Sequence, residues 1–171
     1  MKQIPWFERK FDFSYQQNIF PAIIERLEGT SLRLRAKVAQ VPAAQLTRKP
    51  AGNWSIKEHI GHLTDLEPLW QGRLADVLAG ERYLREADLT NRGTDQAGHN
   101  ETDLQTLLDR FEATRSQTLT SLRSLTESEV RQSALHPRLE QPMRIMDLFL
   151  FVAEHDDHHL VFISQLKKGE A

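Results

Sequence analysis

Cysteine is absent from this 171-residue chain, and its absence excludes several classes of site at once. Disulfide bonds, thiolate nucleophiles, iron–sulfur clusters and cysteine-ligated zinc sites all need a residue that the chain does not contain. Any metal ion must therefore be held by imidazole, carboxylate or water. Any thiol chemistry would need a small-molecule cosubstrate to bring the sulfur.

Long hydrophobic runs and an excess of charge of one sign are also lacking. The longest apolar stretch, residues 146–153, is too short to span a bilayer, and residues 1–13 carry scattered charges where a signal peptide would have an apolar core. The formal net charge is −2 and no face rich in lysine and arginine stands out. We therefore expect a cytoplasmic protein that binds neither nucleic acid nor a membrane. No phosphate-binding glycine loop, dinucleotide fingerprint or Ser-His-Asp pattern indicates another enzyme class.

Histidine is present in an informative place, the C-terminal segment from Met143 to Lys168. An apolar stripe at alternating three- and four-residue steps runs along this predicted helix. Its members are Ile145, Leu148, Val152, His155, His159, Phe162 and Leu166. Residues four apart lie one above the other on a helix, so His155 and His159 have the spacing of metal ligands. Two buried histidines satisfied by hydrogen bonds alone would give the same pattern.

Four amphipathic stretches organise the chain, whose length fits one domain with its own core, residues 1–171. They run over 20–41, 54–80, 104–125 and 143–168. Ser55 and Glu58 have the spacing of a capping box at the start of the second. The third has Asn100 or Thr102 as a candidate cap. No segment alternates with period two, so the stripes predict an all-α fold, a four-helix bundle.

Two connections, 81–99 and 132–142, are longer than a bundle needs, and they either form walls of a binding site or serve as solvated linkers. An N-terminal extension, residues 1–18, precedes the bundle. It is rich in aromatic residues, namely Trp6, Phe7, Phe11, Phe13 and Tyr15. Because it is too apolar to stay in solvent, we expect it to pack over the bundle or over another subunit, and we expect a homodimer.

A three-ligand site needs a third histidine, and the second helix offers His59 and His62. Periodicity slightly favours His59, which projects near the middle of the apolar stripe, whereas His62 falls toward its edge. The pattern leaves both open. Either would complete three protein ligands and leave coordination positions for water or substrate, as expected of a catalytic site.

Two motifs carry a resemblance to a known family. They are Trp54-Ser55-x-x-Glu58-x-x-x-His62-Leu63-x-Asp65 in the second helix and His155-x-x-His158-His159 in the last. Together they resemble the DinB superfamily of metal-binding four-helix proteins, which includes bacillithiol and related thiol S-transferases. The resemblance covers the chain from about Ile19 to Lys168. It implies His62, His155 and His159 as ligands of a divalent metal ion, with zinc or nickel foremost and iron, manganese or copper as alternatives.

Asp65 is the candidate catalytic residue, because a carboxylate one turn beyond His62 could receive the second ring N–H of a ligating histidine or orient a bound water. An exposed helix acid is the alternative. The resemblance implies a divalent-metal-dependent enzyme, either a hydrolase or a thiol S-transferase, with a small-molecule substrate and, in the second case, a low-molecular-weight thiol. A non-catalytic metal holder or sensor with a partner surface, and a metal-free helical binding module, are the other readings.

Five further polar residues near these motifs receive weaker expectations. Asp156 and Asp157 point away from the histidine stripe, so we expect them in solvent. His158 lies at the flank of the stripe, where it could support a ligand. His99 and His136 lie on the long connections, where a lone histidine is usually at the surface.

Overall fold

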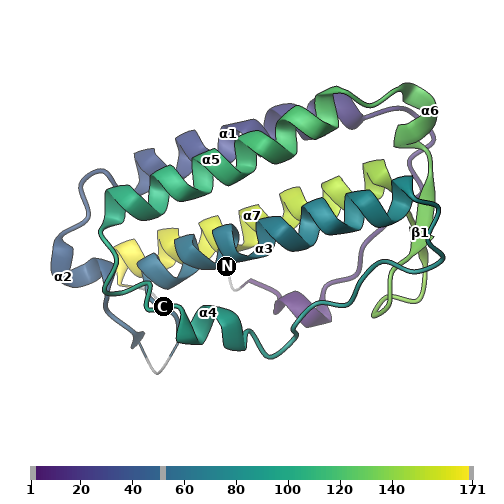
Figure 1. The fold of residues 1–171 in the computed structure, drawn as a ribbon. Helices are drawn as coiled ribbons and strands as arrows, with labels where there is room; N and C mark the ends of the chain where they lie inside the picture. The colour runs from purple at the N-terminus through teal and green to yellow at the C-terminus, as the bar shows by residue number, and fades with distance from the viewer. Residues whose placement is uncertain (1–2, 51–52, 170–171) are drawn as a thin grey trace.

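Four long helices run side by side along the molecule (Figure 1). The structure is a computed structural model and describes residues 3–50 and 53–169. The long helices are α1 (Phe20–Val38), α3 (Ile56–Leu78), α5 (Leu104–Arg123) and α7 (Ile145–Lys168). Helices α1 and α3 each pack against both α5 and α7, so the four close into a ring around a shared core. The predicted all-α four-helix bundle is confirmed.

Short elements occupy the ends and the connections. They are η1 (Trp6–Glu8), α2 (Ala43–Leu46), α4 (Arg92–Gln96), α6 (Glu127–Val130), β1 (Ser133–Leu135) and β2 (Pro142–Arg144). The strands pair antiparallel, with Ser133 opposite Arg144 and Leu135 opposite Pro142. This hairpin corrects the expectation that the chain has no strand. Two strands of three residues each are too short to display period-two alternation.

The predicted capping box fixes the start of α3. The Glu58 backbone N–H donates to Ser55 Oγ at 3.1 Å, and the Ser55 N–H donates to Glu58 Oε2 at 2.8 Å. Two backbone donors at the helix start are thereby satisfied. The start of α3 matters for function because His59 and His62 follow within its first two turns.

The predicted caps of α5 are wrong. The side chain of Asp103 caps this helix, accepting from the Thr106 backbone N–H at 3.1 Å. Asn100 Oδ1 instead accepts from Ser55 Oγ at 2.7 Å, and Thr102 donates its hydroxyl back to the preceding turn. The segment before α5 is therefore tied to the start of α3, a contact that sequence spacing cannot reveal.

A charged layer crosses the middle of the bundle and divides the apolar core into two clusters. The long helices contribute five buried polar side chains to this layer, two of them from α5, namely Thr30, Glu67, Arg115, Thr118 and Asp156. Arg115 donates to Glu67 Oε1 at 2.7 Å and to Asp156 Oδ2 at 2.6 Å. Thr30 Oγ1 donates to the same Asp156 oxygen at 2.9 Å. The expectation that Asp156 is solvated is wrong, because α1 packs on α7 and the Arg115 side chain reaches Asp156 from α5, which leaves it 1% exposed.

The N-terminal extension packs on the bundle. Trp6, Phe11 and Phe13 lie against the apolar cluster that contains the start of α7. Arg9 forms an ion pair with Glu154 on α7 and so ties the segment down. Of the two packing surfaces expected for this extension, the bundle of the same chain is the one observed.

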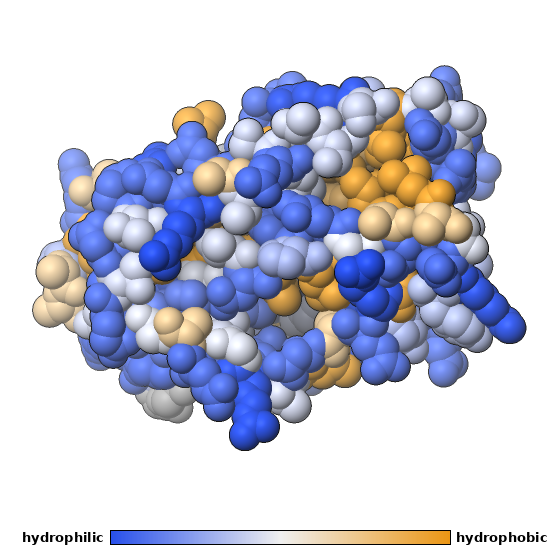
Figure 2. All heavy atoms as spheres, viewed as in Figure 1, coloured by the Kyte–Doolittle hydropathy of each residue, from blue (hydrophilic) through white to orange (hydrophobic). Residues whose placement is uncertain are grey.

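The face of the molecule in Figure 2 is mostly hydrophilic. Its apolar side chains gather on the side where β1 and α6 lie in Figure 1. Across residues 3–50 and 53–169, no helix combines the length and the apolar character that crossing a bilayer requires.

Candidate metal centre

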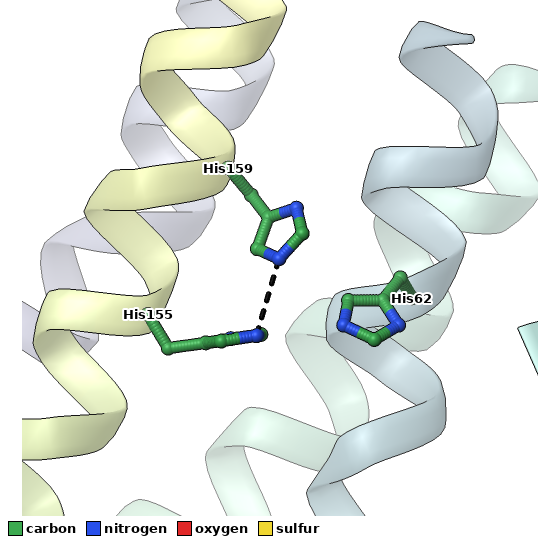
Figure 3. Close-up of side chains that lie close together, drawn as sticks. All are labelled: His62, His155 and His159. Atoms are coloured by element: carbon green, nitrogen blue, oxygen red, sulfur yellow. Dashed lines mark hydrogen bonds between the residues drawn. The ribbon is translucent and has the colours of Figure 1, made fainter. Parts of the chain in front are cut away.

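Three histidines face one another between α3 and α7 (Figure 3). His155 and His159 lie one turn apart on α7, and His62 comes from α3. Each ring offers a nitrogen that lies within 4.8 Å of those of the other two, and all three residues are buried. His155 Nε2 and His159 Nε2 are 3.1 Å apart. The fold thus brings together the three residues that the sequence motifs indicate.

Burial keeps these rings neutral at ordinary pH. Desolvation lowers the pKa of His62 to about 4, and it lowers the pKa of His155 and His159 well below the usual 6.5. The neighbouring histidines lower the pKa of His155 and His159 further, because a second positive charge in the cluster would be repelled. A neutral imidazole keeps a nitrogen lone pair that can bind a metal ion.

The donor set fits a divalent metal ion. Among the described residues, His155 Nδ1 is a buried nitrogen with no hydrogen-bond partner, and the Nε2 of the same ring lies against another histidine nitrogen. Under-satisfied polar atoms are costly in a protein interior unless a further group completes their contacts. Neutral imidazoles suit zinc, nickel, copper and iron. The residues present are therefore the kind that such an ion needs.

Asp65 acts on His62 through a hydroxyl group. His62 Nδ1 lies 3.0 Å from Thr94 Oγ1, and Thr94 Oγ1 donates to Asp65 Oδ2 at 2.8 Å. Because the hydroxyl proton goes to the carboxylate, Thr94 accepts from a protonated Nδ1, which assigns the lone pair of His62 to Nε2. Asp65 does not line the pocket that the described residues form, so it lies behind His62.

His99 is buried against Asp65, which corrects its expected surface position. Its Nε2 lies 2.8 Å from Asp65 Oδ2, and the residue is 8% exposed. Gly61 makes room for it, because a Cβ at this position would lie 2.3–2.4 Å from atoms of the His99 ring. A glycine inside a helix, one turn before Asp65, is the sequence signal that could have indicated a close packing partner.

His59, which periodicity slightly favours as the third ligand, lies behind His159. The Nδ1 atoms of the two rings are 2.8 Å apart, whereas His159 Nε2 faces His155. Desolvation lowers the pKa of His59 to about 3. The group whose ring nitrogens converge contains His62 in place of His59.

The three histidines line a pocket of about 760 Å³. Aromatic side chains form much of its wall, namely Trp6, Trp54, Trp70, Phe151 and Phe162. The N-terminal segment contributes residues 5–7, and the long connections contribute residues 86–89 and 136–138. Both connections therefore act as walls. The volume is within the range of small-molecule sites, about 300–1,000 Å³.

His136, His158 and Arg73 also line this pocket. His136 is 3% exposed, which corrects its expected surface position. Desolvation lowers the pKa of both His136 and His158 to about 4. His158 Nδ1 lies 2.6 Å from Gln3 Nε2, so it supports the N-terminal segment. The sequence gives no signal for Arg73, whose burial depends on a connection that folds back over α3.

Comparisons with known proteins agree with this architecture. A sequence model of the DinB superfamily matches residues 26–163. The fold is similar to that of YfiT from Bacillus subtilis, which is described as a probable metal-dependent hydrolase with an unusual four-helix bundle topology. The TM-score is 0.80 and the sequence identity is 22%, and the match covers 95% of this chain and 93% of that one. It is also similar to the mycothiol-dependent maleylpyruvate isomerase, with TM-score 0.65 and 12% identity over 83% of this chain and 59% of that one. No curated protein matches the sequence.

Proposed function

The chain belongs to the DinB superfamily, and on that premise we propose that it is a divalent-metal-dependent hydrolase of a small-molecule substrate. The observation that carries the proposal is the meeting of three neutral, buried histidines in the lining of a pocket of about 760 Å³. Structural zinc sites have four protein ligands, whereas catalytic ones have three and keep a position open. Among the described residues, the converging group has three members.

His62, His155 and His159 are the proposed ligands. A bound divalent ion, zinc or nickel foremost, would supply Lewis-acid chemistry, lowering the pKa of water toward about 7 and polarising a carbonyl oxygen. The contribution of the chain is to hold three rings neutral and converging on the pocket. Helices α3 and α7 set their spacing, and the buried charged layer beside them fixes how the two helices pack.

Asp65 is proposed as a positioning residue for His62. Metal-binding histidines usually donate their other ring N–H to an acceptor that fixes the tautomer and the ring orientation. Thr94 carries this hydrogen bond from His62 to the carboxylate, and His99 Nε2 lies 2.8 Å from the same carboxylate oxygen. The sequence suggests that Asp65 either receives the second ring N–H of a ligating histidine or orients a bound water, and the geometry favours the first role, with Thr94 between the two residues.

Thiol S-transfer is the second candidate, favoured by the size of the pocket. A volume of about 760 Å³ accommodates a small substrate together with a low-molecular-weight thiol. Because the chain has no cysteine, the sulfur would come from that cosubstrate. One structural neighbour is named as mycothiol-dependent, although at 12% identity it shares the fold alone. A sensor that binds metal without turnover is the remaining alternative.

Metal analysis of protein purified without added nickel or chelator tests the centre. We expect a stoichiometric divalent ion in the wild type and its loss in His155→Ala. Small esters and amides incubated with metal-loaded and with chelated protein test hydrolysis. Consumption of a low-molecular-weight thiol in the presence of an electrophile tests transfer. Metal without turnover would support the sensor, and a metal-free wild type would overturn the proposal.

A further inference from the structure

A buried arginine lines the same pocket away from the three histidines. Arg73, on α3, is 2% exposed, and its Nε donates to the Arg85 carbonyl at 3.1 Å. Burial lowers the pKa of Arg73 to about 10, so the guanidinium remains charged at neutral pH. No carboxylate of residues 3–50 or 53–169 forms an ion pair with it. A buried charge without an ion-pair partner is costly, and so Arg73 needs an explanation.

The acidic side chains around Arg73 offset its charge only in part: the Asp76 carboxylate attracts the guanidinium and opposes the lowering of its pKa by burial, but it makes no hydrogen bond or ion pair with it. Asp76 forms an ion pair with Arg85 at 2.6 Å. The carboxylate of Asp88 accepts from the backbone N–H groups of Thr90 and Arg92, at 2.9 Å each. Glu86 lines the pocket from an exposed position and makes no ion pair with Arg73 within the described part of the chain.

His136 presents a second donor beside the guanidinium. The backbone N–H groups of Arg138 and Leu139 both donate to its Nδ1, at 3.2 Å each. A neutral imidazole has one acceptor nitrogen, so these two donors assign the ring proton to Nε2. Arg73 Nη1 lies 3.1 Å from that Nε2, and a guanidinium can only donate. Two donors therefore meet at the pocket wall, and both need an acceptor.

We propose that Arg73 and His136 form an anion-binding subsite that takes a carboxylate of the small-molecule ligand. One carboxylate oxygen can accept from Arg73 Nη1–H and from His136 Nε2–H, and the planar group matches the guanidinium fork. Arg138, whose guanidinium lies 5.3 Å from the Phe7 ring centroid, adds positive charge at the same wall. The inference rests on the proposed function in one respect, that the substrate occupies this pocket.

Aromatic rings lie between this subsite and the three histidines. The Arg73 guanidinium is 5.5 Å from the Trp70 ring centroid, and the Trp70 and His155 ring centroids are 5.9 Å apart. Phe151 lies beside the subsite, with its ring centroid 6.2 Å from that of Trp70 and 5.6 Å from that of His136. The ligand class is therefore a small organic acid with an apolar or aromatic body. Its reactive group would lie about one ring away from its carboxylate.

Benzoate is the probe for the subsite, and benzamide, which has a similar shape and no charge, is its control. Binding is measured by calorimetry on the full chain, both metal-loaded and chelated. We expect benzoate to bind more tightly than benzamide in both states, because Arg73 acts without the metal. Arg73→Gln should weaken benzoate binding by roughly tenfold or more and leave benzamide unchanged. Arg123→Gln, on the exposed side of α5, should change neither.

Three results would overturn the subsite. The first is equal affinity for benzoate and benzamide. The second is a benzoate affinity that is unchanged in both Arg73→Gln and His136→Gln. The third is loss of benzoate binding on chelation, which would show that the metal ion binds the carboxylate. Inorganic phosphate is a second probe, and tighter binding of phosphate than of benzoate would overturn the carboxylate assignment. If Arg73→Gln does not fold, Arg73→Lys keeps the charge without the fork and should bind benzoate less tightly than the wild type does.

Metal content separates this test from the proposed function. Arg73→Gln should retain the divalent ion while it loses benzoate affinity. His155→Ala should lose the ion and still prefer benzoate to benzamide. A protein that binds no metal but keeps this preference would therefore contradict the proposed function and leave the subsite standing.

Discussion

Single residues outside the proposed centre decide how two of its three rings are held. Thr94 receives the Nδ1 side of His62, and His59 lies against the Nδ1 side of His159. His155 has no comparable partner for its Nδ1 among the described residues. Because such partners fix the tautomer and raise the basicity of a ligand, substitutions at Thr94 and His59 should tune metal affinity without abolishing it.

His62 and His59 can be told apart by alanine substitution. His62→Ala should lose the metal ion, because it removes a proposed ligand. His59→Ala removes only a partner of His159, so it should keep the ion with affinity weaker by roughly tenfold to a hundredfold. Competition with a chromophoric chelator measures both, and circular dichroism checks that helix content is unchanged. An ion kept by His62→Ala and lost by His59→Ala would show that helix periodicity, and not the family motif, identifies the ligand.

Replacement of Gly61 in α3 is predicted to destabilise the fold. A Cβ at this position would lie 2.3–2.4 Å from the His99 ring, so Gly61→Ala should lower the free energy of unfolding by about 1–3 kcal/mol. Gly29 is the matched control, since a Cβ there meets only Arg33 Nε at 4.0 Å. Gly29→Ala should stabilise α1 by up to ~1 kcal/mol. Urea denaturation of the chelated proteins measures both, and equal effects would contradict the packing of His99 on Gly61.

At the scale of helices and strands, local sequence patterns predicted the features that are set within a single helix, namely its position and its start. The apolar stripes located all four long helices, and the Ser55–Glu58 spacing located the start of α3. The errors concern contacts between elements. Asp156 lies off the apolar stripe of its own helix and is still buried, because Arg115 on α5 provides its counter-charge. A pattern within one helix cannot show which polar residue of another helix will pair with it.

The same limit applies to the site. The motifs predicted the histidines that converge, whereas periodicity left His59 and His62 open. His99, His136 and Arg73 depend on connections that fold back over α3, and a connection has no periodic pattern from which its contacts can be read. The sequence could therefore indicate the proposed ligands and the two connections as possible walls, but not which side chains of the pocket wall would be buried together.

Arg115 is predicted to contribute more to the free energy of unfolding than any surface arginine of α5. Its guanidinium pairs with Glu67 and Asp156, and all three side chains are at most 2% exposed. Arg115→Met should lower the free energy of unfolding by about 3–5 kcal/mol, because it leaves two carboxylates buried without a counter-charge. Arg123, on the same helix as Arg115, forms an exposed ion pair with Glu28 of α1, and Arg123→Met should cost at most about 1 kcal/mol. Chemical denaturation compares them, and similar losses would show that water solvates the buried layer.

At the scale of the whole molecule, the homodimer stays a prediction. The N-terminal segment lines one side of the pocket and leaves Ile4 and Phe7 exposed at 59% and 56%, and Leu89 at the pocket wall is 53% exposed. Closed two-fold association is the commonest way to bury such a surface. Light scattering at micromolar concentration should give twice the mass of the chain. Phe7→Ser should shift this mass toward the monomer, and a monomeric wild type would refute the prediction.

Acid sensitivity of the whole molecule should follow from its buried histidines, and His136 offers the cleanest test because it is not a proposed ligand. Its pKa is about 6.5 in an unfolded chain and is lowered to about 4 by burial, so between these values the unfolded chain binds more protons. The contribution of His136 to the free energy of unfolding should therefore have its full value above about pH 6.5 and decline as the pH falls toward 4. His136→Gln removes one such group, so this decline should be shallower by up to ~1.4 kcal/mol per pH unit. Urea denaturation of chelated wild type and variant across this range measures both slopes, and equal slopes would mean that His136 is free to take up a proton in the folded protein.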